Sequence, residues 1–265
     1  MQASALHLAP AAAGLGAGAP ARPAAARLGR PSVTARAASS TRFSPSTAHS
    51  ATSKSKDAPV DVLSIAATLG LTGASIGTFM DGIHSRAQVL IYDTLPLTHG
   101  GLHTSAVVPP LLAAFYLALG GLYYKGDDWM LGAGDQATQS AYRRCNLGTM
   151  CLSFGSVAAI LGLSSMLYAA DVPADQISWA LAFCAAANYL AFDGTKQGLG
   201  LALVCALICP ASELMLMHIL QLWHYPGATL FTEIPHSGIP SWVPWCYFIY
   251  TPAVGQLTRF LKKTA

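Results

Sequence analysis

Long apolar segments separated by more polar links dominate the chain after about residue 60. Each segment is close to the roughly 20 residues that an α-helix needs to cross a hydrocarbon core of about 30 Å. The predicted membrane helices are residues 60–80, 106–124, 145–169, 177–192, 199–222 and 242–261. Together with the polar links between them, they account for the chain after residue 60. The pattern therefore predicts an all-α, polytopic membrane protein with six transmembrane helices and no separate soluble domain.

The stretch 176–200 is the predicted organising element of this bundle. An apolar run ends at Phe192, and a short polar link that contains Asp193 and Lys196 connects it to the next apolar run. Two hydrophobic helices joined by so short a link are expected to be antiparallel neighbours.

The first predicted helix contains Gly70, Gly73 and Gly77, and the last two form a Gly-x-x-x-Gly pair. Small residues at this spacing let two helices approach closely in lipid. Glycines scattered without a packing role are the alternative.

Composition agrees with a membrane protein, because 53% of residues are hydrophobic and only 10% are charged. Ordinary soluble domains contain roughly a quarter charged residues. The six cysteines include no Cys-x-x-Cys pair and all lie in or beside apolar segments. They are expected to be reduced packing residues, with a regulatory disulfide as the alternative.

Residues 1–56 differ from the rest of the chain. They contain five Arg and two Lys, no Asp or Glu, and many Ala, Ser, Thr and Pro. This composition is typical of a transit peptide. The segment Val33-Thr34-Ala35-Arg36-Ala37 resembles a plastid processing site, which favours a plastid membrane. A mitochondrial presequence and a merely disordered tail are the alternatives.

Residues 57–265 form the predicted membrane domain, and their charge is the opposite of that of the leader. They contain 8 Lys or Arg against 12 Asp or Glu, a net charge of −4. A basic surface for nucleic acid is therefore excluded.

Six crossings place nine basic residues on one side of the membrane and only Arg86 on the other. The nine are Lys54, Lys56, Lys125, Arg143, Arg144, Lys196, Arg259, Lys262 and Lys263. Such an asymmetry follows the positive-inside rule, and adding or removing one span would destroy it.

Several segments resemble the Insig (insulin-induced gene) family. Phe192-Asp193, a short polar link and Gly198-Leu199-Gly200-Leu201 are similar to that family's loop between its fourth and fifth helices. Residues 241–248 and 254–259 resemble its last helix, and residues 108–110 resemble part of its second helix. The resemblance implies six helices with both ends on the cytosolic or stromal side. It also implies a non-enzymatic adaptor that binds a sterol-like lipid and a partner membrane protein.

The same resemblance implies roles for particular residues. Asp193, with Gly194 and Lys196 beside it, corresponds to the loop that engages a partner membrane protein. Gln176 and Tyr189, with Asn188 beside the tyrosine, correspond to a lipid-binding pocket. The residues alone also allow plainer roles. Asp193 would then be a solvated acid paired with Lys196, Gln176 an interfacial cap and Tyr189 a lipid-facing ring.

Glu213 is the most unusual side chain, because it lies near the middle of the fifth predicted helix. A charge there costs roughly 2.5–3.5 kcal/mol on insertion scales, so the carboxyl is expected to be protonated, paired or in a wet cavity. Ser212, His218 and Asn188 are its candidate partners. Either a ligand-binding role or a structural hydrogen bond is possible for it.

The link between the first two predicted helices holds five residues that could ligate a metal: Asp81, His84, Asp93, His99 and His103. Imidazole and carboxylate suit zinc or iron. Gly100 and Gly101 argue against one helical face for the last two histidines, so no metal or cofactor is predicted. No catalytic residue is assigned, since the chain has no phosphate-binding Gly-rich loop and no Gly-x-Ser-x-Gly motif.

The function predicted is therefore a membrane adaptor that binds a hydrophobic, sterol-like or isoprenoid-like lipid and a partner transmembrane protein. A small transporter or intramembrane enzyme using Glu213 and His218 is one alternative. An assembly factor of a plastid membrane complex is another. The predicted location is a plastid membrane, with the endoplasmic reticulum as the alternative.

Overall fold

A computed structural model describes residues 61–265 of the chain. The predicted leader, with Lys54 and Lys56, lies outside these residues. The helical elements are α1 (Val62–Thr72), η1 (Gly73–Gly77), α2 (Thr78–Arg86), α3 (Val108–Gly132), α4 (Gln136–Arg144), α5 (Leu147–Ala169), α6 (Ala174–Phe192), α7 (Lys196–Leu220) and α8 (Val243–Thr264). The strands are β1 (Ile91–Tyr92), β2 (Pro96–His99), β3 (Leu102–Ser105) and β4 (Trp223–His224).

All six apolar segments are helical, with α1, η1 and α2 forming the first of them. Three of the described helices are long and apolar enough to cross a membrane: Val62–Arg86, Leu147–Ala169 and Lys196–Leu220. The helices α3, α6 and α8 do not meet the same measure, so six crossings stay a prediction. The region predicted as a loop after residue 124 is mostly helical, because α3 continues to Gly132 and α4 follows.

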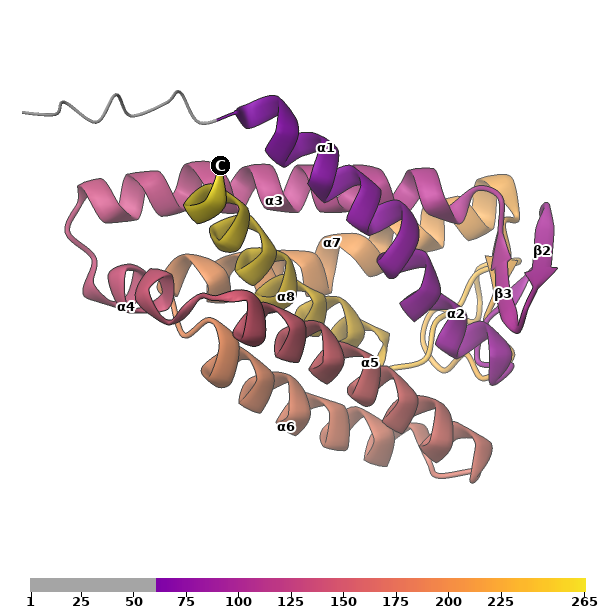
Figure 1. Cartoon of the computed structure of the whole chain (residues 1–265). Helices are drawn as coiled ribbons and strands as arrows, with labels where there is room; N and C mark the ends of the chain where they lie inside the picture. The colour runs from indigo at the N-terminus through magenta and orange to yellow at the C-terminus, as the bar shows by residue number, and fades with distance from the viewer. Residues whose placement is uncertain (1–60) are drawn as a thin grey trace, which may run out of the picture. The chain divides into compact units, whose positions relative to one another are not determined.

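The helix α8 is the centre of the bundle, and the prediction that residues 176–200 organise it is wrong. α8 packs against α3, α5, α6 and α7, and nearly all of its residues from Phe248 to Arg259 are buried. The chain does reverse between α6 and α7 (Figure 1). These two helices nevertheless make few direct contacts, because α8 packs against both.

Gly73 and Gly77 lie where η1 crosses α3, and both are buried. A Cβ atom on Gly73 would collide with the carbonyl oxygen of Leu112 and lie 2.9 Å from the ring of Tyr116. A Cβ atom on Gly77 would lie 3.3 Å from the same ring. The close approach predicted from the Gly-x-x-x-Gly pair is confirmed. It holds α2 beside the amino-terminal part of α3.

Two small antiparallel sheets were not predicted from the sequence. β1 pairs with β4, with Ile91 opposite His224 and Tyr92 opposite Trp223, and β2 pairs with β3. The first pairing ties the link after α2 to the link after α7. Side chains from both links therefore lie close to the ends of α2 and α7.

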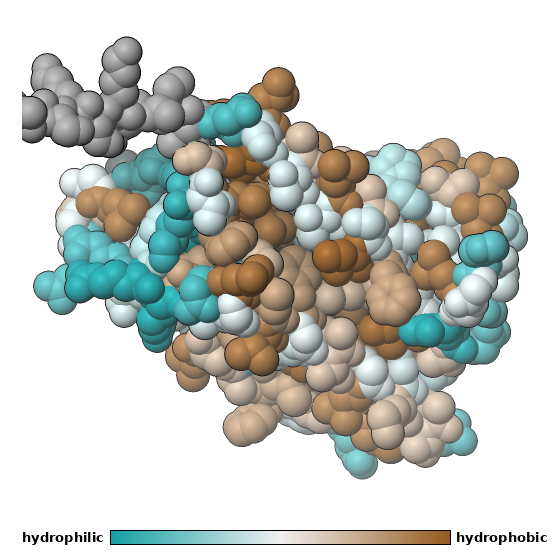
Figure 2. Space-filling view, in the orientation of Figure 1, coloured by the Kyte–Doolittle hydropathy of each residue, from teal (hydrophilic) through white to brown (hydrophobic). Residues whose placement is uncertain are grey.

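The charged side chains lie mainly at the end of the bundle where α3, α6 and α8 end and α7 begins (Figures 1 and 2). Lys125, Arg143, Lys196 and Lys263 belong to this basic end. Arg86 ends α2 beside the strands, at the opposite end. The arrangement agrees with the charge asymmetry read from the sequence, for the residues that the structure describes.

Candidate functional site

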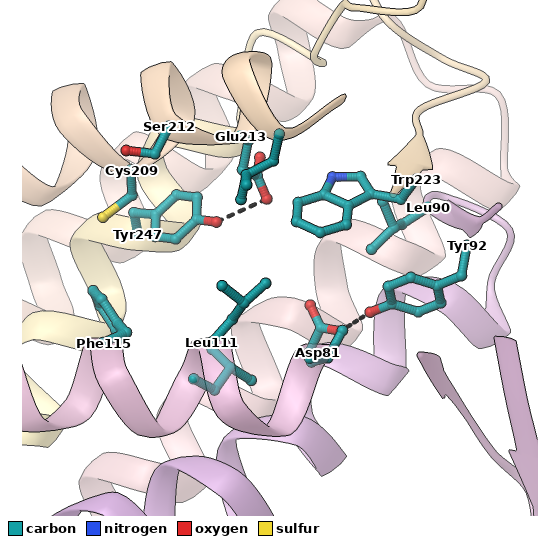
Figure 3. Close-up of a pocket in the computed structure, with 13 residues that line it drawn as sticks. Asp81, Leu90, Tyr92, Leu111, Phe115, Cys209, Ser212, Glu213, Trp223 and Tyr247 are labelled. Carbon is teal, nitrogen blue, oxygen red and sulfur yellow. Dashed lines mark hydrogen bonds between the residues drawn. The ribbon is translucent and has the colours of Figure 1, made fainter. Parts of the chain in front are cut away.

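A cavity of about 220 Å³ lies between α2, α3, α7 and α8, at the end of the bundle near the strands (Figure 3). Its walls are mainly apolar and aromatic, and two carboxylates, Asp81 of α2 and Glu213 of α7, reach it. A smaller cavity of about 50 Å³ adjoins it and shares Asp81, Glu213 and Tyr247 with it. The two cavities are together called the chamber, and the residues they share include the two acids and the Tyr247 hydroxyl.

Glu213 is 8% exposed and accepts hydrogen bonds from two tyrosines. The Tyr247 hydroxyl donates to Oε1 at 2.7 Å. The Tyr225 hydroxyl lies 3.1 Å from both carboxylate oxygens. Burial and the neighbouring carboxylate raise the pKa of Tyr225 well above its usual value, so this hydroxyl remains a donor.

The partners predicted for Glu213 were wrong. The Ser212 hydroxyl donates to the Ile208 carbonyl, and the exposed His218 ring bonds to the carbonyl of Pro235. Asn188 lies on α6 and donates to the carbonyl of Ile249, 3.2 Å away. Since Glu213 and His218 do not meet, the pair proposed for transport or catalysis does not form in this structure.

Asp81 is the second acid of the chamber, and the Tyr92 hydroxyl donates to it. Burial and this carboxylate raise the pKa of Tyr92, so the phenol keeps its proton. Trp223, which pairs with Tyr92 across the β1–β4 ladder, also lines the cavity. The two small strands thus bring one donor to Asp81 and one aromatic ring to the cavity wall.

The cavity opens between α3 and α7. Leu111 of α3 lines it and is 38% exposed, and Ser212 of α7 lines it and is exposed as well. Exposed apolar residues such as Leu207 and Ile208 continue from this opening along α7. The mouth of the cavity is therefore flanked by exposed apolar side chains.

Asp193, in the link between α6 and α7, is fully buried. Arg259 of α8 donates to it at 3.1 Å, the Tyr123 hydroxyl at 2.5 Å and the Thr195 hydroxyl at 2.7 Å. Arg259 also makes a two-pronged ion pair with the buried Asp127, through Nε at 2.8 Å and Nη2 at 3.1 Å. Asp193 therefore does not pair with Lys196, and in this conformation it cannot touch a partner itself.

Gly194 and Lys196 are the exposed residues of this link. Gly194 has φ +72°, a left-handed conformation that suits glycine, and its amide donates to the Tyr189 carbonyl. Thr195 is the N-cap of α7 and accepts from the Gly198 amide at 3.0 Å. The buried Asp193 thus fixes a short loop in which Thr195 is also buried, while Gly194 and Lys196 are accessible.

The residues implied as a lipid pocket do not form one site. Tyr189 and Asn188 lie at the contact of α6 with α8, where Tyr189 donates to the Thr195 carbonyl and packs against Phe248. Gln176 is exposed near the start of α6, about 18 Å along the helix from Asn188. Of the four ligand-binding residues predicted, only Glu213 lines the chamber.

The five metal-ligand candidates do not lie together either. Asp81 bonds to Tyr92, His84 to Ser164, and Asp93 to His224, while His99 and His103 lie on the β2–β3 hairpin. Among the described residues, no group of three or more His, Cys, Asp or Glu is placed to hold a metal ion.

Sequence reasoning missed several residues of the chamber and of the buried ion cluster: Tyr92, Tyr225, Tyr247, Asp127 and Tyr123. For Asp127 a signal was present, because Asp127 and Asp128 form a pair of acids separated by only two residues from the end of a predicted apolar segment. The tyrosines carried no such signal, since tyrosine is common at membrane interfaces.

Comparison with solved structures identifies the fold. The chain is similar to the crystal structure of a mycobacterial Insig homolog, MvINS from Mycobacterium vanbaalenii, at 18% identity and a TM-score of 0.59. The match covers 75% of this chain and 94% of that one. A cross-linked trimer of MvINS gives 20% identity, a TM-score of 0.59, and 74% and 93% coverage. No protein-family model and no curated protein match the sequence.

The chain is therefore a helical membrane protein with an Insig-like fold. The resemblance read from the loop and last-helix motifs is confirmed at the level of the fold. At this identity the likeness does not extend to ligand or partner.

Proposed function

We propose that this protein is a non-enzymatic membrane regulator. It binds an amphiphilic lipid in the chamber between α3 and α7, and contacts a partner membrane protein through the loop between α6 and α7. The observation that carries the proposal is the chamber itself, which is apolar, opens sideways and ends in two acids.

The size and opening of the chamber suit part of a lipid. A cavity of roughly 150 Å³ accommodates benzene, so about 220 Å³ holds a polar head and its first carbons. The rest of an acyl or isoprenoid chain would leave past Leu111 and Ser212 into the membrane. Sites of this kind are largely apolar, with a few polar groups that fix the orientation of the ligand.

The loop between α6 and α7 supports the second part of the proposal. Gly194 and Lys196 are accessible, and the ion cluster of Asp127, Arg259 and Asp193 holds the loop in one conformation. A preformed loop loses little entropy on binding a partner. The resemblance to the Insig loop at Asp193 points to the same surface.

The chamber and the loop lie at opposite ends of the bundle. Leu111 and Asp127 are sixteen residues apart on α3, which corresponds to about 24 Å. The helix α8 contacts both regions through Tyr247 and Arg259. A lipid that favours one packing of α8 would change the population of the partner-binding state.

The proposed location and lipid class rest on the composition of residues 1–56. A plastid address, read from residues 1–56, would place the protein away from sterol-synthesis membranes. An isoprenoid, a pigment precursor or another plastid lipid is then the proposed class of ligand. Location in the endoplasmic reticulum is the alternative.

Mass spectrometry of the purified full-length protein tests both parts. Leu111→Trp fills the mouth of the cavity, and Leu122→Trp is its control, because Leu122 is 55% exposed on the same helix and lines neither cavity. A lipid enriched in the wild type and in Leu122→Trp, but lost in Leu111→Trp, is expected. Equal lipid content in all three proteins would refute the chamber as the binding site.

The partner part needs a separate variant. Lys196→Glu reverses the charge of the exposed loop without touching the ion cluster, and Lys125→Glu reverses a charge elsewhere at the basic end. A membrane protein recovered with the wild type and with Lys125→Glu, but lost with Lys196→Glu, is expected. Identical recovery with all three would remove the loop from the proposal.

A further inference from the structure

The two acids of the chamber have no cationic partner among the described residues. The four ion pairs of this part of the chain involve neither Asp81 nor Glu213. Neither cavity is lined by Lys or Arg, and the one histidine, His84, bonds to Ser164. Carboxylates in an apolar setting are costly unless a counter-charge accompanies them.

The donors that do reach these acids leave capacity for a ligand. One tyrosine donates to Asp81 and two donate to Glu213. An ionised carboxylate offers about four acceptor positions. Both acids can therefore accept further N–H or O–H groups from a molecule in the chamber.

Aromatic rings form much of the wall around the acids. Phe115, Tyr92, Tyr247 and Trp223 line the cavity (Figure 3). The rings of Phe115 and Tyr247 have their centroids 6.2 Å apart, and those of Tyr92 and Trp223 lie 6.4 Å apart. Ring faces attract cations, and do so more strongly where water is excluded.

Trp223 supplies an independent indication of a ligand. Its side chain lines the cavity beside Glu213, the residue is only 6% exposed, and its Nε1–H has no hydrogen-bond partner within residues 61–265. Buried polar groups are almost always paired, so this donor calls for an acceptor that the described part of the chain does not provide. A ligand that satisfies all these groups has a cation for the acids and an oxygen for the indole.

We infer that the chamber is a binding site for a long-chain amino alcohol. The ammonium group lies between Asp81 and Glu213, and a neighbouring hydroxyl accepts from Trp223 Nε1–H. The hydrocarbon chain leaves through the opening beside Leu111. This inference rests on the proposed lipid-binding function of the same chamber and names the class of head group.

Three lipid probes distinguish the contribution of the ammonium charge from that of the hydroxyls and the hydrocarbon chain. Sphinganine carries an ammonium and hydroxyls on a long chain, and N-acetylsphinganine has the same backbone with a neutral nitrogen. Octadecylamine keeps the ammonium but lacks the hydroxyls. Binding to the full-length protein in mild detergent is measured by native mass spectrometry. Sphinganine should bind about tenfold or more tightly than N-acetylsphinganine, the ratio for one lost charge-assisted hydrogen bond.

Variants test whether this preference for sphinganine depends on the two acids and on the indole of Trp223. Glu213→Gln and Asp81→Asn should each weaken sphinganine binding about tenfold. Glu233→Gln and Asp171→Asn, exposed acids outside the chamber, should leave it unchanged. Trp223→Phe keeps an aromatic wall, and should remove the preference for sphinganine over octadecylamine.

The outcomes distinguish this inference from the proposed function. Equal binding of sphinganine and N-acetylsphinganine overturns the amino alcohol and leaves a neutral lipid in the chamber. This comparison uses the wild type alone, so it holds even if a variant fails to fold. Absence of binding for all three probes, together with no native lipid in the purified protein, overturns both.

Discussion

Arg259 is the residue whose removal should damage this fold most. It lies in the last third of the central helix α8 and is fully buried. Its guanidinium pairs with Asp127 at 2.8 Å and with Asp193 at 3.1 Å, and the side chains of both acids are also fully buried. The substitution Arg259→Met keeps the length of the side chain and removes the charge, which leaves two acids without a counter-ion.

The expected cost follows from the burial of the cluster. Removing one partner of a buried ion pair typically destabilises a protein by about 3–5 kcal/mol, because the remaining charge is not compensated. The control is Asp93→Asn, since Asp93 lies 2.8 Å from His224 and the two side chains are 42% and 46% exposed. Solvent-exposed pairs contribute about 0–1 kcal/mol, so the control should unfold close to the wild type.

Denaturant unfolding of the purified full-length protein in mild detergent measures this difference. The triple variant Arg259→Met, Asp127→Asn, Asp193→Asn should recover part of the lost stability, because it removes the uncompensated charges together with the cation. An Arg259→Met protein within about 1 kcal/mol of the wild type would refute the reasoning, since surface pairs alone reach that size.

Two pairs of glycine substitutions test the close contacts of the bundle. Gly73→Ala should destabilise the protein by about 1–3 kcal/mol by overpacking against α3, whereas Gly121→Ala, with open space around its Cβ, should change thermal stability by about 1 kcal/mol or less. Gly198→Ala drives a methyl group into the Asp193 carboxylate and should raise protease cleavage of the α6–α7 loop, while Gly200→Ala has open space and should not. Equal behaviour within either pair would contradict the packing described.

The positions of the helices could be predicted from hydropathy, but their arrangement could not. All six apolar segments are helical, and most ends lie within three residues of the prediction. The exceptions are the first two helices, which continue six and eight residues further, to Arg86 and Gly132. Lipid-facing and protein-facing positions are both apolar in a membrane bundle. Hydropathy therefore did not distinguish α8, which is buried on most sides, from α6, whose Trp179 and Phe183 are exposed.

The hydrogen-bond partners of Glu213 and Asp193 could not be predicted, because they lie far from these acids in the sequence or in another helix. Glu213 was recognised because a carboxylate is rare within an apolar helix, yet its partners Tyr225 and Tyr247 come from the following link and from α8. The predicted partners Ser212 and His218 lie one and five residues from Glu213 on the same helix, and side chains at these spacings do not face each other. Asp193 looked like a solvated loop acid, because its partner Arg259 is sixty-six residues away.

The functional proposals depend on a bundle that spans the membrane, with the basic end and the strand end on opposite sides. Labelling with a membrane-impermeant maleimide tests this directly. Cysteines replace Gln136 in α4, Lys196 in the α6–α7 loop and His236 beyond β4, three exposed positions, one at a time in otherwise cysteine-free full-length protein in sealed vesicles. The account predicts that Gln136→Cys and Lys196→Cys are labelled from the same side and His236→Cys only from the other. Labelling of all three from one side would contradict the membrane arrangement and the lipid-facing chamber with it.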